Sequence, residues 1–159
     1  FSRKAVERAR MVKNRGFYLD LLQLYDFIQK KDYQYPSTPS LAHMFALDYQ
    51  LDYIINEEGL ENRFARHEEM MEMVREWAGR NFALLAEDDI ASRTVTTVVN
   101  TKNIDISELN RELKKKGMMI SNGYGDLKDK TFRIAHMADT TPAHITELLD
   151  NLDDILGLN

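Results

Sequence analysis

Apolar residues recur every three or four positions over the first part of the chain, which is the spacing of amphipathic helices. The pattern predicts four helices, over residues 3–13, 17–30, 41–59 and 60–79, the last two ending at glycines. Between the second and third helices, the segment KDYQYPSTPS contains two prolines, which predicts a loop over 31–40. Its Thr38-Pro39 pair predicts the start of the third helix, with Thr38 as the N-cap.

The spacing of the apolar residues changes after residue 80, from the helical period to that of strands. Short apolar or β-branched segments predict strands over residues 82–86, 94–99, 118–121 and 131–137. Two more helices are predicted, over 107–116 with Ser107 as the N-cap, and from Pro142 with Thr141 as the N-cap. This order indicates an α+β fold, an α/β sandwich in which a small antiparallel or mixed sheet of about four strands has helices on one face. We expect a domain boundary near residue 58.

Composition narrows the classes of function. The chain has 159 residues, of which 43% are hydrophobic and 30% charged, enough for a core without cross-links. It contains no cysteine, which excludes disulfides, thiolate metal sites and thiol nucleophiles within it. No apolar run approaches the ~20 residues of a membrane-spanning helix. Phe1 is followed by charged residues rather than by a signal peptide, so we expect a cytoplasmic location and no membrane partner.

Charge is distributed unevenly along the chain. Residues 1–16 hold six Lys or Arg side chains against Glu7 alone, whereas the whole chain has a net charge of −5. The basic segment is compatible with a nucleic-acid-binding arm, but its interleaved apolar residues favour an amphipathic helix. The acidic remainder argues against a duplex-binding surface, so we expect no nucleic-acid partner. The four histidines lack the spacing of a metal site, and we predict no metal.

Arg133 is the most informative charged residue. Alternation along the predicted strand places Arg133, Ala135 and Met137 on one face, and Phe132 and Ile134 on the other. A guanidinium among small and apolar neighbours needs a partner, because an unpaired buried charge is strongly destabilising. That partner is either an Asp or Glu of the chain or the carboxylate of a ligand, held by two parallel hydrogen bonds.

Two other segments carry candidate binding groups. The loop from Asn122 to Asp126 contains Gly-Tyr-Gly, whose backbone amides either bind an anion or simply turn the chain between two strands. Tyr35 and Thr38 flank the loop before the third helix, and the free amides at a helix N-terminus bind anions. The alternative is that Thr38 only caps the helix and Tyr35 is a surface residue.

Three segments together resemble the C-terminal part of class V aminotransferases, which are pyridoxal-phosphate enzymes of fold type I. They are TPSLAHMFALDYQLDYIINEEGLENRFARHEE, SRTVTTVV and ISNGYGDLKDKTFRIAHMA, in the same order and over nearly the whole chain. The chain is most similar to the alanine–glyoxylate and serine–pyruvate group. The resemblance implies that residues 1–57 are terminal helices of the large domain with the interdomain helix, and that 58–159 form the small C-terminal domain.

The resemblance also assigns roles to individual residues. Arg133 matches the arginine that binds the α-carboxylate of the substrate. Tyr35 and Thr38 match the tyrosine and threonine that reach the cofactor phosphate of the partner subunit. Ala135 and His136 depart from the pattern of many relatives, which have Gly and a variable residue there. In that family the lysine that binds the cofactor covalently lies upstream, which implies that this chain alone has no catalytic residue and is inactive.

Two functions from different classes are compatible with these observations. The first is the C-terminal domain of a homodimeric aminotransferase that uses pyridoxal 5'-phosphate. It would transfer an amino group between a small amino acid, of alanine or serine type, and a 2-oxo acid of glyoxylate or pyruvate type. The second is a stand-alone αβ module that binds an acidic small molecule through Arg133 without catalysis. A large upstream domain with a lysine-bearing strand favours the first function, and a methionine directly before Phe1 favours the second.

Overall fold

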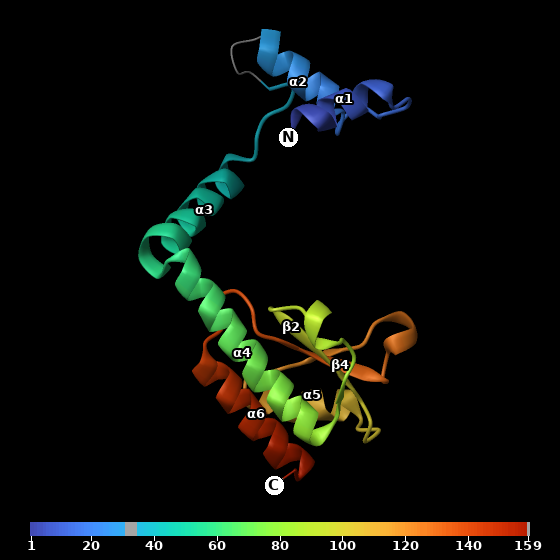
Figure 1. Cartoon of the computed structure of the whole chain (residues 1–159), viewed down its shortest axis with the longest axis vertical. Helices are drawn as coiled ribbons and strands as arrows, with labels where there is room; N and C mark the ends of the chain where they lie inside the picture. Colours follow the sequence, from blue (N-terminus) through green and yellow to red (C-terminus); the bar gives the residue numbers. More distant parts are fainter. Residues whose placement is uncertain (31–34, 159) are drawn as a thin grey trace. The chain divides into compact units, whose positions relative to one another are not determined.

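The computed structural model describes residues 1–30 and 35–158 (Figure 1). The chain divides into two compact units, Phe1–Asp52 and Tyr53–Asn159, and each is described by itself. The first unit is helical, and the second contains the sheet. Within the described ranges, no helix combines the length and the apolar character needed to cross a bilayer.

Three helices form the first unit: α1 (Arg3–Met11), α2 (Leu21–Lys30) and α3 (Leu41–Asp52). α2 begins later than the pattern predicts because the Asp20 carboxylate accepts a hydrogen bond from the N–H of Leu22 at 3.0 Å. This bond satisfies an N–H of the first helical turn that has no partner within the helix, and it fixes the helix start at Leu21. Of the predicted loop, residues 31–34 lie outside the described residues, and 35–40 are non-helical.

The start of α3 shows that the prediction for Thr38 as a helix cap is wrong. The helix begins at Leu41, so neither Thr38 nor Pro39 lies at its first turn. The N–H of Leu41 donates to the carbonyl of Pro39 at 3.0 Å, which makes a separate turn before the helix. Ser40 directly precedes the helix, and its hydroxyl pairs with the His43 ring at 2.6 Å. The Thr38 hydroxyl is therefore not used in capping.

The second unit begins with η1 (Tyr53–Glu58), a π-helical segment where the pattern predicts a continuous α-helix. Gly59 ends this segment, as predicted, with a φ of 81°. That angle lies in the left-handed region, which glycine adopts without a Cβ clash. The division between the two units falls between Asp52 and Tyr53, at the start of η1.

The long helix α4 (Leu60–Asn81) passes Gly79, where the pattern predicts its end. Nothing lies within 4 Å of a Cβ built at Gly79, and its φ is not positive, so no feature of that position stops the helix. α4 ends where Phe82 becomes extended and packs its ring against Trp77, with 5.4 Å between the ring centroids. Packing in the core, rather than a glycine, thus sets the end of α4.

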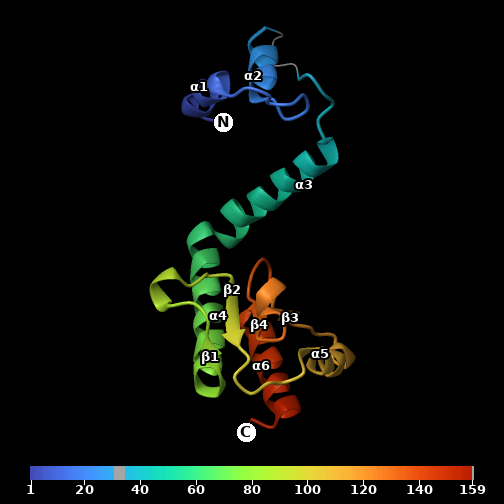
Figure 2. The ribbon, with the colours of Figure 1, turned by 90° about the vertical axis from the view of Figure 1, so that its right-hand side faces the viewer.

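Four antiparallel strands form one sheet in the order β1-β2-β4-β3, which confirms the predicted fold class (Figure 2). The strands are β1 (Ala83–Leu84), β2 (Val95–Val99), β3 (Ser121–Asn122) and β4 (Thr131–Ala135). β2 and β4 form the long central pair. β1 is shorter than its predicted range of 82–86, and β3 overlaps its predicted range of 118–121 only at Ser121. The chain leaves β1 for the turn η2 (Asp88–Ile90) and β3 for the turn η3 (Gly125–Leu127), which limits the pairing at both edges.

Helix α5 (Ile106–Lys115) has a different cap from the predicted Ser107. The Asp105 carboxylate accepts hydrogen bonds from the N–H groups of Ser107 and Glu108, at 2.8 and 3.0 Å. One carboxylate oxygen satisfies two free amides, and its negative charge favours the positive end of the helix dipole. Asp105 is therefore the N-cap, and Ser107 lies in the first turn.

Helix α6 (Pro142–Leu156) begins as predicted. The Thr141 hydroxyl accepts from the N–H of His144 at 3.3 Å, and the His144 ring accepts from the N–H of Thr141 at 3.3 Å. These reciprocal bonds form a capping box and satisfy two amides at the helix start.

The core of the second unit lies between the sheet and α4, α5 and α6, with α4 and α6 packed side by side (Figure 2). The rings of Trp77, Phe82 and Phe132 form an aromatic cluster with centroid distances of 5.3 to 6.5 Å. The Trp77 indole N–H donates to the Asp153 carboxylate of α6 at 2.6 Å. Buried residues of all three helices join one cluster with β2 and β4, which confirms that the helices cover one face of the sheet.

Candidate functional site

Arg133 lies in the middle of β4, with paired strands on both sides. Phe132 and Ile134 are fully buried toward the helices, whereas Arg133 is half-buried and Ala135 is exposed. This alternation confirms the predicted faces of the strand. Arg133 therefore extends from the face of the sheet that the helices leave open. Thr97 lies directly opposite it on β2.

The guanidinium of Arg133 has two partners in the structure, and neither is a carboxylate. Its Nε donates to the backbone carbonyl of Asn122 at 3.3 Å. Its Cζ lies 4.0 Å from the centroid of the Tyr124 ring. Within residues 1–30 and 35–158, no Asp or Glu makes an ion pair with Arg133, and its two terminal nitrogens donate no hydrogen bond. The two terminal nitrogens of Arg133 are thus left without a partner among the residues that the structure describes.

The loop between β3 and β4 uses its own polar groups to fix its shape. The Asn122 side-chain oxygen accepts from the N–H groups of Gly123 and Asp129 at 2.7 and 2.9 Å. The Gly123 N–H also donates to the carbonyl of Thr131 at 2.9 Å. Because the Gly123 amide is bonded within the loop, it is not available to an anion, and this part of the loop serves as a turn.

Gly123 has a steric role in the same loop. A Cβ at this position would lie 2.1 Å from the carbonyl oxygen of Leu127 and 2.5 Å from the Thr131 hydroxyl. Real Cβ atoms do not approach backbone this closely, so only glycine fits without displacing the chain. The tight turn carries the next residue, Tyr124, over β4.

Tyr35 and Thr38 lie together in the first unit. With Pro36, Ser37 and Pro39 they line an open hollow of about 500 Å³. Tyr35 is 52% exposed, and among the described residues neither its hydroxyl nor that of Thr38 makes a hydrogen bond. Two hydroxyls near the start of α3 are therefore without a hydrogen-bond partner among residues 1–30 and 35–158. Arg133 belongs to the second unit, so the candidate residues lie in both units.

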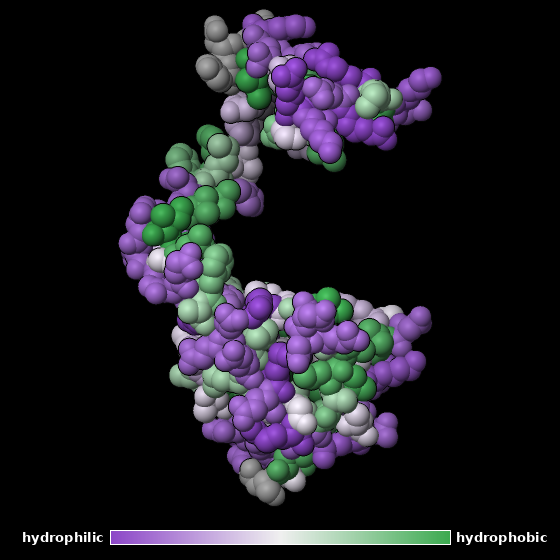
Figure 3. Space-filling model, viewed as in Figure 1, coloured by the Kyte–Doolittle hydropathy of each residue, from purple (hydrophilic) through white to green (hydrophobic). Residues whose placement is uncertain are grey.

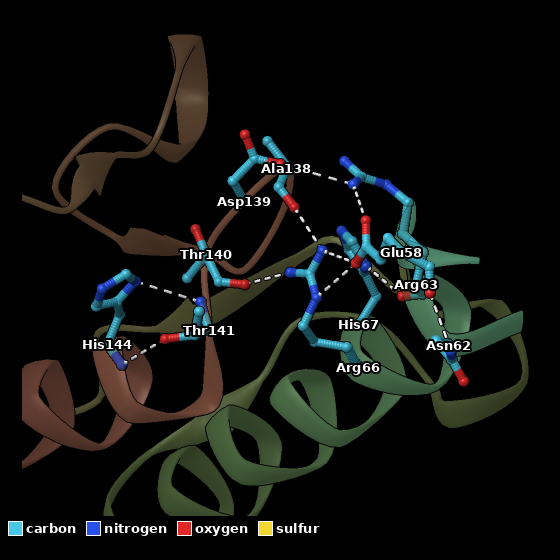
Figure 4. A network of polar contacts seen from close by, with 10 residues as sticks. All are labelled: Glu58, Asn62, Arg63, Arg66, His67, Ala138, Asp139, Thr140, Thr141 and His144. Atoms are coloured by element: carbon cyan, nitrogen blue, oxygen red, sulfur yellow. Dashed lines mark hydrogen bonds and ion pairs between the residues drawn. The ribbon is translucent and has the colours of Figure 1, made fainter. Parts of the chain in front are cut away.

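A network of charged side chains ties η1 and α4 to the turn that follows β4 (Figure 4). Glu58 pairs with Arg63 and with Arg66, each at 2.5 Å, and all three side chains are less than 20% exposed. Arg66 also donates to the backbone carbonyls of Thr140 and, at 3.0 Å, of Ala138. One guanidinium thus holds two carbonyls of the chain segment that leaves β4.

The Glu58 carboxyl is stabilised in its ionised form. Burial alone raises its pKa, but the hydrogen bonds and charges of Arg66 and Arg63 outweigh burial and hold the pKa below its ordinary value of 4.5. Because the folded-state pKa lies below the unfolded one, the carboxylate stabilises the fold above that ordinary value. This contribution is lost as the pH falls through the folded-state pKa.

Glu58→Gln is expected to lower the free energy of unfolding by about 1–2 kcal/mol at pH 7, because two partly buried guanidinium groups lose a charged acceptor. The loss should shrink when the pH falls through the folded-state pKa of Glu58, since the wild-type carboxyl is then neutral as well. Urea unfolding of the wild type and the variant, at pH 7 and at successively lower pH, measures this loss of free energy at each pH. Glu76→Gln, at an exposed ion pair with Arg80, is the matched control. An equal loss at every pH would contradict the electrostatic account.

The buried histidines have structural contacts. His67 bonds through Nδ1 to the carbonyl of Arg63 at 2.6 Å. His136 bonds through Nε2 to the Thr96 hydroxyl at 3.0 Å, and burial lowers its pKa, which favours the neutral ring. In the part of the chain that the structure describes, no three His, Asp or Glu side chains lie close enough together to hold a metal ion.

A hollow of about 480 Å³ lies beside His67, between the start of α4 and the start of β2. Its two cationic side chains are already paired, Arg63 with Glu58 and Arg93 with Glu68. Because carboxylates of the same unit neutralise these two charges, this hollow is a weaker candidate site for an anionic ligand than the terminal nitrogens of the Arg133 guanidinium.

The sequence pattern did not single out Tyr124, Glu58 or Arg66. Tyr124 lies in the Gly-Tyr-Gly segment, for which the sequence left a turn and an anion site as alternatives, and no local signal shows that this loop folds back over β4. Glu58 and Arg66 each lie four positions from Asn62. Polar residues at this spacing are typical of the solvent-exposed surface of a helix. The contact of Arg66 with Ala138 spans 72 residues, and no local signal predicts it.

Comparison with known proteins identifies relatives over nearly the whole length of the chain, although no family model matches it. It is 37% identical over 126 residues to an uncharacterized aminotransferase of Methanocaldococcus jannaschii, which covers 77% of this chain and 32% of the relative. It is 29% identical over 160 residues to the serine–glyoxylate aminotransferase of Arabidopsis thaliana, covering 98% of this chain and 39% of the relative.

The fold is also similar to that of solved aminotransferases. The pyridoxamine–pyruvate aminotransferase from Mesorhizobium loti matches 99% of this chain and 41% of its own, with a TM-score of 0.84 and 27% identity. The chain thus spans between 32% and 41% of the length of these relatives. Sequence and fold together confirm the resemblance: the relatives and structural neighbours are class V aminotransferases, and the chain matches their C-terminal portion.

Proposed function

We propose that this chain is the C-terminal part of a cytoplasmic, homodimeric aminotransferase that uses pyridoxal 5'-phosphate. The enzyme transfers an amino group between a small amino acid, of alanine or serine type, and a 2-oxo acid of glyoxylate or pyruvate type. Residues 1–57 complete the large domain and connect it to the small domain, which is residues 58–159. Relatives named as serine–glyoxylate and pyridoxamine–pyruvate aminotransferases support this substrate class.

The main observation in support of this proposal is that one edge of the Arg133 guanidinium has no partner among the described residues. Its terminal nitrogens have no partner among the described residues, although the side chain is half-buried. A planar guanidinium with two parallel donors matches a carboxylate, and every substrate of the proposed reaction has one. Arg133 binds that carboxylate and so fixes the orientation of the bond that is broken at the α-carbon.

The first unit fits the phosphate of the cofactor. The hydroxyls of Tyr35 and Thr38 have no partner among the described residues and lie next to the start of α3, where free amides and the helix dipole favour an anion. We propose that they bind the phosphate of the cofactor held by the partner subunit. When bound, the cofactor supplies the electron sink of the reaction.

No lysine among the described residues has the setting that covalent attachment of the cofactor needs. Every lysine among the described residues is exposed, whereas a reactive lysine requires a desolvated or apolar setting to lower its pKa. We therefore propose that the attachment lysine lies in the large domain of the longer protein, here called the full-length enzyme. The isolated chain is expected to be inactive in transamination.

Complementation between two inactive variants tests the proposal. One full-length variant is Tyr35→Phe with Thr38→Val, and the other is Arg133→Ala. In a mixed dimer, one site combines the intact Arg133 of the first variant with the intact Tyr35 and Thr38 of the second. That site should regain activity, up to half of the sites of a normal dimer, when the two variants are co-expressed.

Each variant expressed alone is the control, since its dimers contain two defective sites. Mixed dimers that are no more active than either parent would show that the loop serves its own subunit or none. Activity in dimers of the Tyr35 and Thr38 variant alone would remove the phosphate role from these two residues.

A further inference from the structure

Tyr124 is an aromatic residue that folding leaves open to solvent. Its side chain is 76% exposed, so the hydrophobic core gains nothing from it. Its ring nevertheless lies over the guanidinium of Arg133, with Cζ 4.0 Å from the ring centroid. That distance is well within the range of a cation–π contact. Among the described residues, Arg133 is the residue that makes a ring contact with Tyr124.

The backbone holds Tyr124 in this place. Gly123 before it allows a closer approach of the chain to Leu127 than any side chain would permit. The carbonyl of Tyr124 accepts from the N–H of Leu127 at 3.0 Å, at the start of η3. Tyr124 is thus presented from a tight, hydrogen-bonded turn rather than from a free loop.

The two partners of Arg133 leave one edge of the guanidinium open. The central carbon of the guanidinium lies over the Tyr124 ring, and the Asn122 carbonyl accepts from Nε. Only the terminal nitrogens remain without a partner among the described residues. The neighbours directly across the strands, Thr97 and Ser121, are small, so they do not block this edge.

We propose that Tyr124 is a positioning residue for Arg133 and that it fixes the plane in which the enzyme accepts a carboxylate. This proposal rests on the proposed function and extends it. An arginine side chain has many rotamers, and restricting them before the substrate arrives lowers the entropy cost of binding. Tyr124 acts through Arg133 on carboxylate affinity, so it affects KM more than kcat.

Kinetics of the full-length enzyme with alanine and glyoxylate give the first test. Tyr124→Leu should raise KM for both substrates about 2- to 5-fold, the size expected for an exposed cation–π contact, with kcat changed less than about twofold. Tyr124→Phe keeps the aromatic face and should retain the wild-type KM. Leu127→Ala, in the same turn, is the control for a general loosening of the loop.

Nuclear magnetic resonance of the 159-residue chain gives a second test, which needs no activity. The side-chain Nε–H signal of Arg133 should carry a ring-current shift that persists in Tyr124→Phe and disappears in Tyr124→Leu. A signal that is unchanged in Tyr124→Leu would overturn the proposal. This readout tests the contact between Tyr124 and Arg133 even if the full-length protein has no aminotransferase activity.

The kinetic outcomes separate the two proposals. If Arg133→Lys retains wild-type kinetics, the proposed function of Arg133 fails. If Arg133→Lys loses activity while Tyr124→Leu keeps the wild-type KM, only the role of Tyr124 fails. A lower melting temperature of Tyr124→Leu with an unchanged KM would show that Tyr124 contributes to stability and does not position Arg133 for binding.

Discussion

Arg133→Lys in the full-length enzyme is expected to lower kcat/KM for carboxylate substrates by about 10- to 150-fold, the equivalent of a charged hydrogen bond of about 1.5–3 kcal/mol. Lysine keeps the positive charge but replaces two parallel donors by one compact ammonium group. It also loses the flat surface that lies 4.0 Å from the Tyr124 ring centroid in the wild type.

Steady-state kinetics with alanine and glyoxylate measure this effect. Arg111→Lys is the matched control, because it makes the same substitution at an exposed arginine of the same unit that pairs with Glu108. Its kinetics should equal those of the wild type. Wild-type kinetics of Arg133→Lys would show that Arg133 does not bind the substrate carboxylate.

The strand pattern around Arg133 was predictable because it depends on neighbours in sequence. Alternation alone separates Phe132 and Ile134, which are fully buried, from Arg133 on the open face. The four strands and the last helix follow from the same local rules, since Thr141 and Pro142 carry the start signal of α6 within two residues. Neighbouring residues are sufficient to predict an element wherever the alternative conformations of that segment differ strongly in free energy.

Helix starts were predicted less well, because several polar residues compete to cap the same amides. Asp105 caps α5 in place of Ser107, two positions away, since its carboxylate reaches two amides and carries a charge. Thr38 is likewise not the N-cap of α3, because a turn at Pro39 precedes the helix, which begins at Leu41. A sequence pattern marks the region of such a helix start, but the hydrogen bonds decide the residue.

The partners of Arg133 could not be predicted, because they depend on how a loop folds back onto a strand. The sequence left an internal carboxylate and a ligand carboxylate as alternatives. The structure instead provides the carbonyl of Asn122 and the ring of Tyr124, and neither neutralises the charge. The same holds for Arg66, whose bonds to Ala138 and Thr140 join segments that are far apart in the chain.

Trp77→Ala is expected to lower the free energy of unfolding of the second unit by about 3–5 kcal/mol, the usual cost of removing a large aromatic ring from a core. Trp77 is 1% exposed, and its ring contacts those of Phe82 and Phe132. Its loss leaves a cavity against β4 and also removes the bond to Asp153 of α6. Trp77→Phe keeps most of the ring packing and should lose less.

Urea unfolding followed by circular dichroism measures the effect, since Trp77 is the sole tryptophan and its fluorescence is lost in both variants. The chain has two units, so the transition of the second unit has to be resolved from that of the first. Glu72→Ala, on an exposed position of the same helix, is the control and should change the free energy by less than about 0.5 kcal/mol. An equally small change in Trp77→Ala would mean that the aromatic cluster does not hold α4 and α6 to β4.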